Sequence, residues 1–358
     1  MSPKLSVVIC SLNGAAGVDR CIRALATQTM RSDLEIIVSD DGSTDDTSEM
    51  ARARGAIVTR SATNRGVSAA RNSGVDIASA SIVAFIDDDC EPESQWAEQL
   101  IAGYDEHAVA MGGPLLVGGD ASLILDYVAR HNPLEPQELD LAKSDKLPYR
   151  LYLYIKRQWK SPAPRGRREV FSFASANMSV RRQAFLDVGG FDERFRFGAE
   201  DEDLCRRLRR GFPAGRLVFT PEARVRHYFK ASLRDTLRRR YAYGRGSAQL
   251  YRKWPSVRPT FFHGPLVVLA MLALSVRIPA LIAVAVVLPH LLYPQGLRTA
   301  VADLRAQCLL DAYLQLVEES SDDVGFLEGL WRFRHLVPEP STETVSAVGP
   351  RAGTGLVP

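Results

Sequence analysis

Three consecutive aspartates, Asp87, Asp88 and Asp89, follow directly after the apolar run of residues 82–86. Neighbouring carboxylates repel one another, and each carboxylate costs free energy when it is taken out of water. A divalent cation would supply the missing positive charge, because Mg²⁺ and Mn²⁺ bind carboxylate oxygens together with the phosphate oxygens of nucleotides. We therefore predict a metal site that neutralises a diphosphate as it departs. The alternative is a strand end that is simply solvated.

A second acidic pair, Asp40 and Asp41, precedes the sequence GSTDDT. One of these carboxylates could accept a hydrogen bond from the imide N–H of a nucleobase or from a ribose hydroxyl. Aspartate also favours turns and helix N-caps, so the pair could serve only the local backbone. The two interpretations are compatible.

A third acidic group, Glu200 and Asp201, opens a predicted helix and is followed by two more acids, Glu202 and Asp203. Acids in a first helical turn are common because they favour the helix dipole. Four in a row exceed this need, so we expect one carboxylate to point elsewhere. Within reach of a substrate hydroxyl, that carboxylate would act as a general base.

Arg71 and His227 each have a structural and a functional interpretation. Arg71 is either a solvated helix charge, a phosphate contact or a prop for the acidic cluster. His227 is either a strand histidine satisfied by its neighbours or a third metal ligand, because neutral imidazole binds ions such as Mn²⁺.

Strands alternate with helices in the first part of the chain, which predicts a parallel sheet covered by helices on both faces. The predicted strands are LSVVICS, LEIIVSDD, AIVTRSA and SIVAFIDDD. Ligands of such sheets bind at the carboxyl ends of the strands. Asp40–Asp41 and Asp87–Asp89 both fall at these ends, so we expect them at one edge of the sheet.

The later segments are less regular. Residues 131–169 are rich in proline and basic residues and are predicted to be a loop or a poorly ordered insertion. The sequence EVFSFASANMSV reads as one strand, and GRLVFTPEARVRHYF reads as a β-hairpin.

The charge distribution and the cysteine content indicate the environment in which the protein works. Residues 206–258 hold sixteen Lys or Arg against only Glu222 and Asp235. The five cysteines are scattered and odd in number, which favours a reduced, cytosolic setting over a disulfide framework.

An apolar stretch, residues 261–294, follows the basic block and is interrupted by Arg277 and Pro279. As one helix it would be about 50 Å long, against about 30 Å for the hydrocarbon core of a bilayer. Two short helices on either side of Arg277 fit better, as a re-entrant hairpin or in the membrane interface. The alternative is a helical domain packed on the catalytic core. The basic residues before it favour a membrane surface over nucleic acid.

Six segments together resemble the family 2 inverting glycosyltransferases, which have the GT-A fold, an α/β Rossmann-like sheet. They are LSVVICSLNG, IIVSDDGSTDDT, NRGVSAARNSG, VAFIDDDCEP, SANMSVRRQAFLDVGGFDE and GAEDEDLCRRLRRGF, in family order over residues 4–230. The Q-x-x-R-W signature of relatives is absent, and RRRYAYGRG, with Arg240, Tyr243 and Arg245, is the nearest equivalent. Single addition of a sugar is therefore expected rather than processive synthesis.

The resemblance implies roles for particular residues. Asp201 would be the catalytic base, with Glu200 beside it, and Asp89 the direct metal ligand. The implied residues for the nucleotide-sugar are Ser11, Asn13, Asp40, Asp41, Arg71, Asp87 and Asp88; for Mn²⁺ or Mg²⁺, Asp87, Asp89 and His227; for the acceptor side, Asn177 and Met178.

The expected organisation is a catalytic domain at 1–230, with the nucleotide-sugar bound by 1–115 and the acceptor by 116–230. A basic interfacial helix at 231–258, a membrane-associated helical region at 259–337 and a disordered tail at 338–358 would follow.

The expected activity is transfer from a UDP-, GDP- or dTDP-sugar to a glycan, glycolipid or lipid-linked acceptor, at the cytoplasmic face of the cell membrane and without nucleic acid. Alternatives are a sugar nucleotidyltransferase and a non-catalytic sugar-binding scaffold. A dehydrogenase is weaker still, because G-x-G-x-x-G is missing after the first strand.

Overall fold

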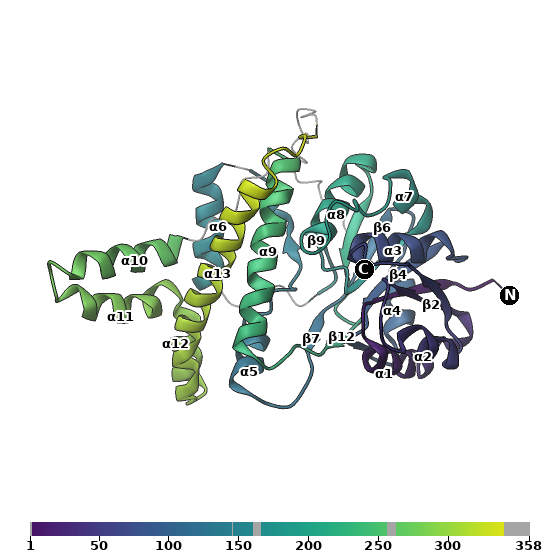
Figure 1. Cartoon of the computed structure of the whole chain (residues 1–358), viewed down its shortest axis with the longest axis horizontal. Coiled ribbons are helices and arrows are strands. Elements are labelled where there is room, and N and C mark those ends of the chain that lie inside the picture. Colours follow the sequence, from purple (N-terminus) through teal and green to yellow (C-terminus); the bar gives the residue numbers. More distant parts are fainter. Residues whose placement is uncertain (1, 145, 160–165, 256–262, 340–358) are drawn as a thin grey trace, which may run out of the picture.

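The structure is a computed structural model that describes residues 2–144, 146–159, 166–255 and 263–339. A nine-stranded sheet forms its centre, in the order β3-β2-β1-β4-β10-β6-β11-β9-β8. A helical region stands beside this domain and carries a projecting pair of helices (Figure 1). The predicted α/β class, with a helical C-terminal part, is confirmed.

The first half of the sheet is parallel, as the alternation of strands and helices predicts. Its strands are β1 (Leu5–Ser11), β2 (Leu34–Asp40), β3 (Ile57–Arg60) and β4 (Ile82–Asp87). Val7 and Ile9 of β1 pack in one apolar cluster and Val8 in another, on opposite faces of the sheet. Burial on both faces explains why β1, β2 and β4 are mostly apolar. Strand β3, at the edge of the sheet, is more exposed.

Helices cover both faces of this sheet. Residues of α1 (Ala15–Ala26), α2 (Thr47–Ala53) and α4 (Trp96–Ala102) pack in the cluster with Val7 and Ile9. Residues of α3 (Val67–Asp76), α7 (Arg182–Asp187) and α8 (Glu200–Gly211) pack in the cluster with Val8.

The second half of the sheet is mixed. Its strands are β6 (Ala108–Gly112), β8 (Gln137–Glu138), β9 (Arg168–Ser172), β10 (Asn177–Arg181) and β11 (Arg216–Phe219). Strand β10 is antiparallel to both of its neighbours, β4 and β6. A small sheet combines β5 (Cys90–Pro92), β12 (Val225–His227) and β7 (Leu115–Val117).

Two predictions for this half are wrong. The segment predicted as a hairpin forms β11 and β12, which belong to different sheets because both edges of β12 are taken by β5 and β7. The segment predicted as one strand forms β9 and β10, which are not neighbours in the sheet. Alternating hydrophobicity indicates a strand but not its partner.

The predicted loop at 131–169 is also wrong. It contains β8, a 3₁₀ turn (Leu139–Ala142) and α6 (Leu147–Trp159); residues 145 and 160–165 lie outside the described residues. One side of α6 turns toward the helical region, where the Tyr154 hydroxyl donates a 2.9 Å hydrogen bond to Glu319. This tertiary contact stabilises a helix that composition alone did not indicate.

Helix α9 (Leu233–Lys253) packs along α13 (Asp311–Arg332) at very short range. A Cβ atom on Gly244 would overlap the carbonyl oxygen of Asp322, and one on Gly325 would overlap that of Tyr241. The predicted basic helix is therefore present, but it is a packed element of the protein. Arg240 pairs with Glu318 at 2.9 Å, and Lys253 is buried.

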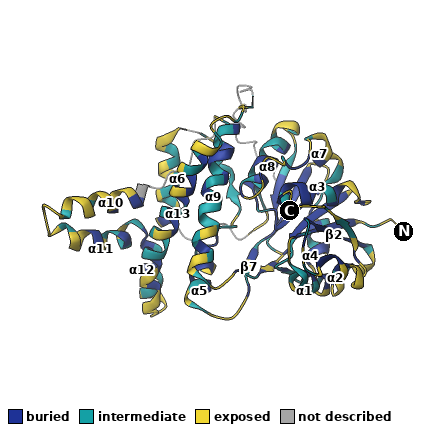
Figure 2. Cartoon of the chain, in the orientation of Figure 1, coloured by how far each residue is buried: buried dark blue, intermediate teal, exposed yellow. Residues whose placement is uncertain are grey.

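Helices α10 (His263–Ser275) and α11 (Leu281–Leu292) form a hairpin with Arg277 in its turn, as predicted from the apolar stretch. The hairpin projects from the body and is largely exposed, so it does not pack on the catalytic core (Figures 1 and 2). Within the described ranges, no helix alone has the length and apolar character needed to cross a bilayer. Helices α11 and α12 (Pro294–Ala302) meet this test only together, and they are bent by 75°.

The remaining elements are short. They are α5 (Leu123–Arg130) and 3₁₀ turns at Arg31–Asp33 and Ala306–Leu310. The predicted disordered tail lies outside the described residues from 340 onward.

Substitution Gly244→Val should lower the melting temperature of the protein, because its side chain would force α9 and α13 apart. Overpacking of this kind costs about 1–3 kcal/mol. Thermal unfolding followed by circular dichroism measures the effect. Gly166→Ala is the control, since a Cβ there meets no atom within 4 Å. Equal melting temperatures for the two variants would contradict the packing described.

Candidate active site

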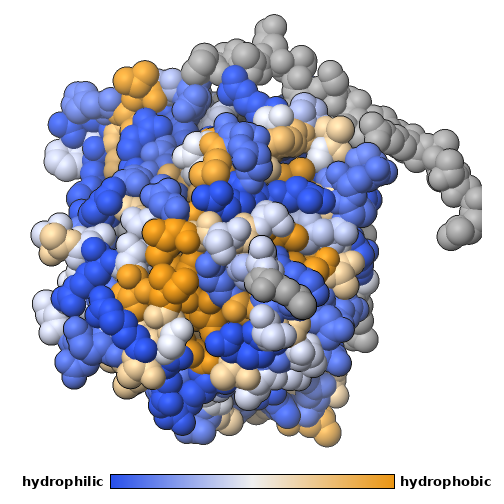
Figure 3. All heavy atoms as spheres, turned by 90° about the vertical axis from the view of Figure 1, so that its right-hand side faces the viewer, coloured by the Kyte–Doolittle hydropathy of each residue, from blue (hydrophilic) through white to orange (hydrophobic). Residues whose placement is uncertain are grey.

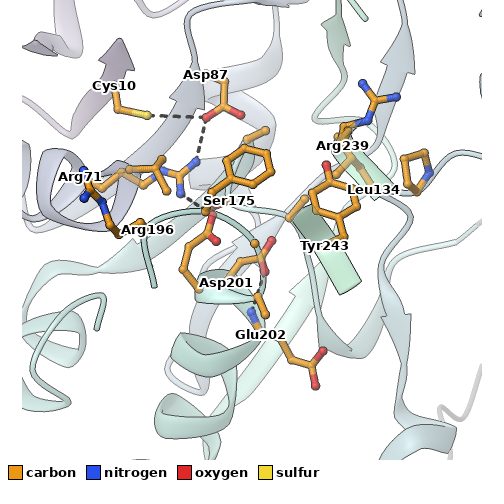
Figure 4. Close-up of a pocket in the computed structure, with 18 of the residues that line it drawn as sticks. Cys10, Arg71, Asp87, Leu134, Ser175, Arg196, Asp201, Glu202, Arg239 and Tyr243 are labelled. Atoms are coloured by element: carbon orange, nitrogen blue, oxygen red, sulfur yellow. Dashed lines mark hydrogen bonds and ion pairs between the residues drawn. The ribbon is translucent and has the colours of Figure 1, made fainter. Parts of the chain in front are cut away.

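A cavity of about 800 Å³ lies where the carboxyl ends of β1 and β4 meet the start of α8 and the inner side of α9. Ser11, Asp41 and Asp87–Asp89 line it on the sheet side, and residues 196–202, which lead into α8, line it as well. Residues 172–176, 133–135 and Gln137 add another wall. In the close-up, Arg239, Tyr243 and Leu134 lie across the cavity from Arg71 and Asp87 (Figure 4).

Arg71 holds two of the acids together. Its Nη2 donates to Asp87 Oδ1 at 2.8 Å and its Nη1 to Glu200 Oε1 at 3.0 Å, and its side chain is only 3% exposed. Of the three interpretations, the prop for the acidic cluster is the one found, and the solvated charge is wrong. Glu200 is correspondingly a buried partner of Arg71, which makes it a positioning residue.

Asp201 is the acid that remains available. Its Oδ1 accepts a 2.8 Å hydrogen bond from the backbone N–H of Glu202, and its Oδ2 has no partner among the described residues. Burial raises the pKa of Asp201 to about 7, and the charge of Glu200 adds to this effect. Gly198 and Ala199, both with left-handed backbone (φ +86° and +65°), turn the chain into the helix that presents this carboxylate.

Asp88 faces the loop between β1 and α1. It accepts a hydrogen bond from the hydroxyl of Ser11. A Cβ on Gly14 would overlap its carboxylate, so glycine is needed for this approach. Burial raises the pKa of Asp88 to about 7, with added effects of Asp89 and Asp87. The cluster thus carries more negative charge than the surrounding side chains neutralise.

Asp89, the last of the three consecutive aspartates, lies next to His227 of β12. Asp89 Oδ1 lies 3.4 Å from His227 Nε2, and the ligand atoms of Asp89, Cys90 and His227 lie within 4.8 Å of one another. Burial lowers the pKa of His227 to about 4, so its imidazole is neutral and can ligate a metal.

The residues present fit a divalent cation. Burial, and then the charge of Asp87, raises the pKa of Asp89 to about 7, and a bound cation would relieve this repulsion. A site with one carboxylate and one neutral imidazole suits Mn²⁺ better than Mg²⁺, because Mg²⁺ prefers ligands that are all oxygen atoms. Asp87 lies outside this group, because its Oδ1 is engaged by Arg71.

The second acidic pair divides its roles. Asp40 does not line the cavity; it accepts hydrogen bonds from Ser43 N and the Ser48 hydroxyl, which is the predicted turn role. Asp41 lines the cavity and accepts from the backbone N–H groups of Arg65 and Gly66.

Asn13 was expected to contact the nucleotide, but it does not line the cavity. Its side chain is exposed outside the cavity lining and accepts from Thr44, with a left-handed backbone (φ 56°). It fixes the loop between β1 and α1 against the loop that follows β2.

Asn177 and Met178 were expected on the acceptor side, but neither side chain faces the cavity. Both are fully buried in β10, where Asn177 accepts from Trp96 Nε1 and donates to two backbone carbonyls. The residues that do face the cavity precede them, in Ser172–Ala176. The error arises because β10 begins at Asn177, so the loop ends two residues earlier than expected.

Sequence reasoning missed a stripe on α9. Arg239, Tyr243 and Ser247 are spaced by four residues and all line the cavity. Arg239 makes no ion pair within the described part of the chain, and its guanidinium lies 4.4 Å above the ring of Phe229. The helical spacing was available in the sequence, but the direction of the stripe was not.

Comparisons with known proteins agree with this geometry. The model described as "Glycosyl transferase family 2" matches residues 6–186, and that described as "Glycosyl transferase family group 2" matches residues 163–294. A pre-mycofactocin glycosyltransferase of Mycobacterium tuberculosis is 32% identical over 257 residues, which are 70% of this chain and 48% of that protein. The chain thus spans about half the length of this relative.

Two further matches cover more of the other chain. A glucosyl-dolichyl phosphate glucuronosyltransferase of Haloferax volcanii is 27% identical, over 63% of this chain and 69% of that protein. The structure of a mannosyltransferase from Pyrobaculum calidifontis, in complex with GDP-Man and Mn²⁺, covers 93% of this chain and 88% of that chain. Its TM-score is 0.55 at 16% identity, which concerns the fold alone.

Substitution Arg71→Met should destabilise the protein by about 3–5 kcal/mol, because it leaves Glu200 as an uncompensated buried charge. Denaturant unfolding measures the loss.

Arg65→Met is the matched control. Arg65 pairs with Glu193 at 2.7 Å, but both side chains are nearly half exposed, so a loss below about 1 kcal/mol is expected. A similar loss for both variants would show that Arg71 does not bridge buried acids.

Proposed function

Because the chain belongs to glycosyl transferase family 2 and has the GT-A fold, we propose that it is a metal-dependent inverting glycosyltransferase. It moves a sugar from a nucleoside-diphosphate sugar to a hydroxyl group of an acceptor. Single addition is expected.

The observation that carries this proposal is the meeting of three elements in one cavity. The acids at the end of β4, Asp41 beyond β2 and the available carboxylate of Asp201 all line it. Its volume lies in the range of small-molecule and cofactor sites, and a nucleotide-sugar and an acceptor hydroxyl fit in it together.

Asp201 acts as the general base in this mechanism. It takes the proton of the acceptor hydroxyl while that oxygen attacks the anomeric carbon in line with the leaving diphosphate. A single displacement inverts the anomeric centre. Glu200, held by Arg71, fixes the first turn of α8 and adds the negative charge that keeps Asp201 a strong enough base.

The leaving diphosphate requires positive charge. Arg239, which has no acidic partner in the described chain, supplies one such group from α9. Asp89 and His227 would hold the metal ion, which when bound neutralises the charge that develops on the diphosphate. Ser11 and Asp88 shape the wall beside them.

The acceptor and the setting are parts of the same proposal. The name of the Haloferax relative contains a lipid-linked sugar, glucosyl-dolichyl phosphate. A lipid-linked acceptor at the cytoplasmic face of a membrane suits a chain whose helical region exposes an apolar hairpin on its side turned away from the catalytic domain (Figure 2).

Binding of UDP, GDP, dTDP and CDP, with Mn²⁺ or Mg²⁺ or with a chelator, tests the donor site by calorimetry. We expect one nucleotide to bind in a metal-dependent way. Asp89→Asn should weaken this binding by at least 10-fold, whereas Asp76→Asn, at the exposed last residue of α3 and outside the cavity lining, should leave it unchanged. Absence of nucleotide binding in the presence of metal would favour a non-catalytic scaffold.

Substitution Asp201→Asn should lower the transfer rate about 10²–10⁴-fold, the usual contribution of a general base. The wild-type rate should rise with pH and level off above about 7, because the base acts only when ionised. Release of nucleoside diphosphate in the presence of an acceptor measures both.

The melting temperature of Asp201→Asn distinguishes a catalytic role of Asp201 from a structural role. A raised pKa means that ionisation of Asp201 disfavours the folded state above pH 7, so Asp201→Asn should melt at pH 8 no lower than the wild type. A variant that is both inactive and unstable would not support the catalytic assignment.

A further inference from the structure

The hairpin of α10 and α11 is an apolar element that the described residues leave uncovered over most of its surface. Each helix is about 20 Å long at 1.5 Å per residue. Figure 1 shows the hairpin leaving the body at a steep angle to α9 and α13. Figure 2 shows its surface as mostly exposed beyond the base.

Its apolar side chains point in all directions. Twelve large hydrophobic residues between positions 264 and 292 are at least 40% exposed: Leu266, Val267, Leu269, Leu272, Leu274, Val276, Ile278, Ile282, Val284, Val286, Val287 and Leu291. A helix that docks on a protein normally has one apolar stripe and a polar face. A surface that is apolar all round is typical of a helix surrounded by lipid.

The body at the base of the hairpin continues this surface. Leu151, Tyr152, Ile155 and Trp159 of α6 are exposed, and so are Val324, Leu327 and Trp331 on the side of α13 that is turned away from α9. Tryptophan and tyrosine favour the boundary between hydrocarbon and water. The opposite end of the molecule is mostly hydrophilic, with an apolar patch near its centre and smaller apolar areas around it (Figure 3).

The small number of charged residues in the hairpin also favours lipid as its surroundings. Arg277, in the turn, is the only Lys, Arg, Asp or Glu between residues 264 and 292. On insertion scales, one arginine costs about as much as seven large apolar residues gain, and the hairpin offers twelve large apolar side chains. A second protein would need to enclose the hairpin on every side, whereas lipid does so without a complementary shape.

We propose that the α10–α11 hairpin inserts into a single leaflet of a lipid bilayer, with the exposed sides of α6 and α13 lying at the membrane surface. One leaflet contributes about 15 Å of hydrocarbon, so a hairpin of this length enters it without crossing the bilayer. This deepens the membrane part of the proposed function and rests on none of its chemistry.

Flotation of the full chain with vesicles of phosphatidylcholine tests the proposal, in 0.1 M and 0.5 M NaCl and without nucleotide or sugar. We expect the wild type to float in both salts, because insertion does not depend on charge attraction. Leu272→Glu should reduce vesicle binding at least 10-fold. Leu186→Glu, at a similarly exposed leucine of α7 in the catalytic domain, should not.

The variant Arg277→Leu should bind vesicles more tightly than the wild type. Damage to the fold would not produce such a gain in binding. Binding only to vesicles that contain phosphatidylglycerol, and only at 0.1 M NaCl, would overturn insertion in favour of surface attraction by basic residues.

A lipid-free dimer would also overturn the proposal, if Leu272→Glu dissociates it and the wild type does not bind vesicles. Sedimentation equilibrium measures the dimer. Nucleotide binding by Leu272→Glu should equal that of the wild type, so failure of this inference and failure of the proposed donor site are distinguishable.

Discussion

The ion pairs of Arg71 with Asp87 and Glu200 are the interaction on which the arrangement of the cavity depends. They join the end of a central strand to the first turn of a helix that lies 129 residues from Arg71 in the sequence. A buried guanidinium between two carboxylates satisfies both the charge and the planar geometry of the group. Because Arg71 neutralises Glu200 and part of Asp87, the neighbouring acids Asp89 and Asp201 remain available for metal and proton.

A second buried cation ties the helical region to the same helix. Lys253, at the end of α9, lies 2.7 Å from both Asp192 and Asp203, and Trp254 donates to Asp203 as well. Asp203 stands two residues after Asp201, so the position of α9 is coupled to that of the proposed base. This coupling explains why Arg239 and Tyr243 can complete the cavity from a part of the chain outside the sheet.

Much of this arrangement could be predicted from the sequence, because parallel strands place their carboxyl ends at one edge. That rule places the acids at 87–89 and the pair Asp40–Asp41 at this edge, and a helix start accounts for the acids at 200–203. The choice of Asp201 among the latter came from the resemblance to the family. Asn177 and Met178 were misassigned because a shift of one or two residues moves a side chain from a loop into a strand. Arg239 stands among three consecutive arginines. Only tertiary packing shows that Arg240 pairs with Glu318, while Arg239 has no acidic partner among the residues that the structure describes. The hairpin turn was predictable from Arg277 and Pro279, since both interrupt an apolar helix.

Asp322 of α13 lines the same cavity as Asp87, near the opposite end of the described chain. The segment matched by the family 2 model, residues 6–186, therefore holds the donor-side acids but neither the proposed base nor the wall formed by α9 and α13. In evolutionary terms, the catalytic sheet and the C-terminal helices are not interchangeable modules. Recombination that replaced one without the other would have to recreate contacts as close as that of Gly246 on α9, where a Cβ atom would overlap the carbonyl oxygen of Gly198 in the catalytic domain, so the two parts are expected to diverge together.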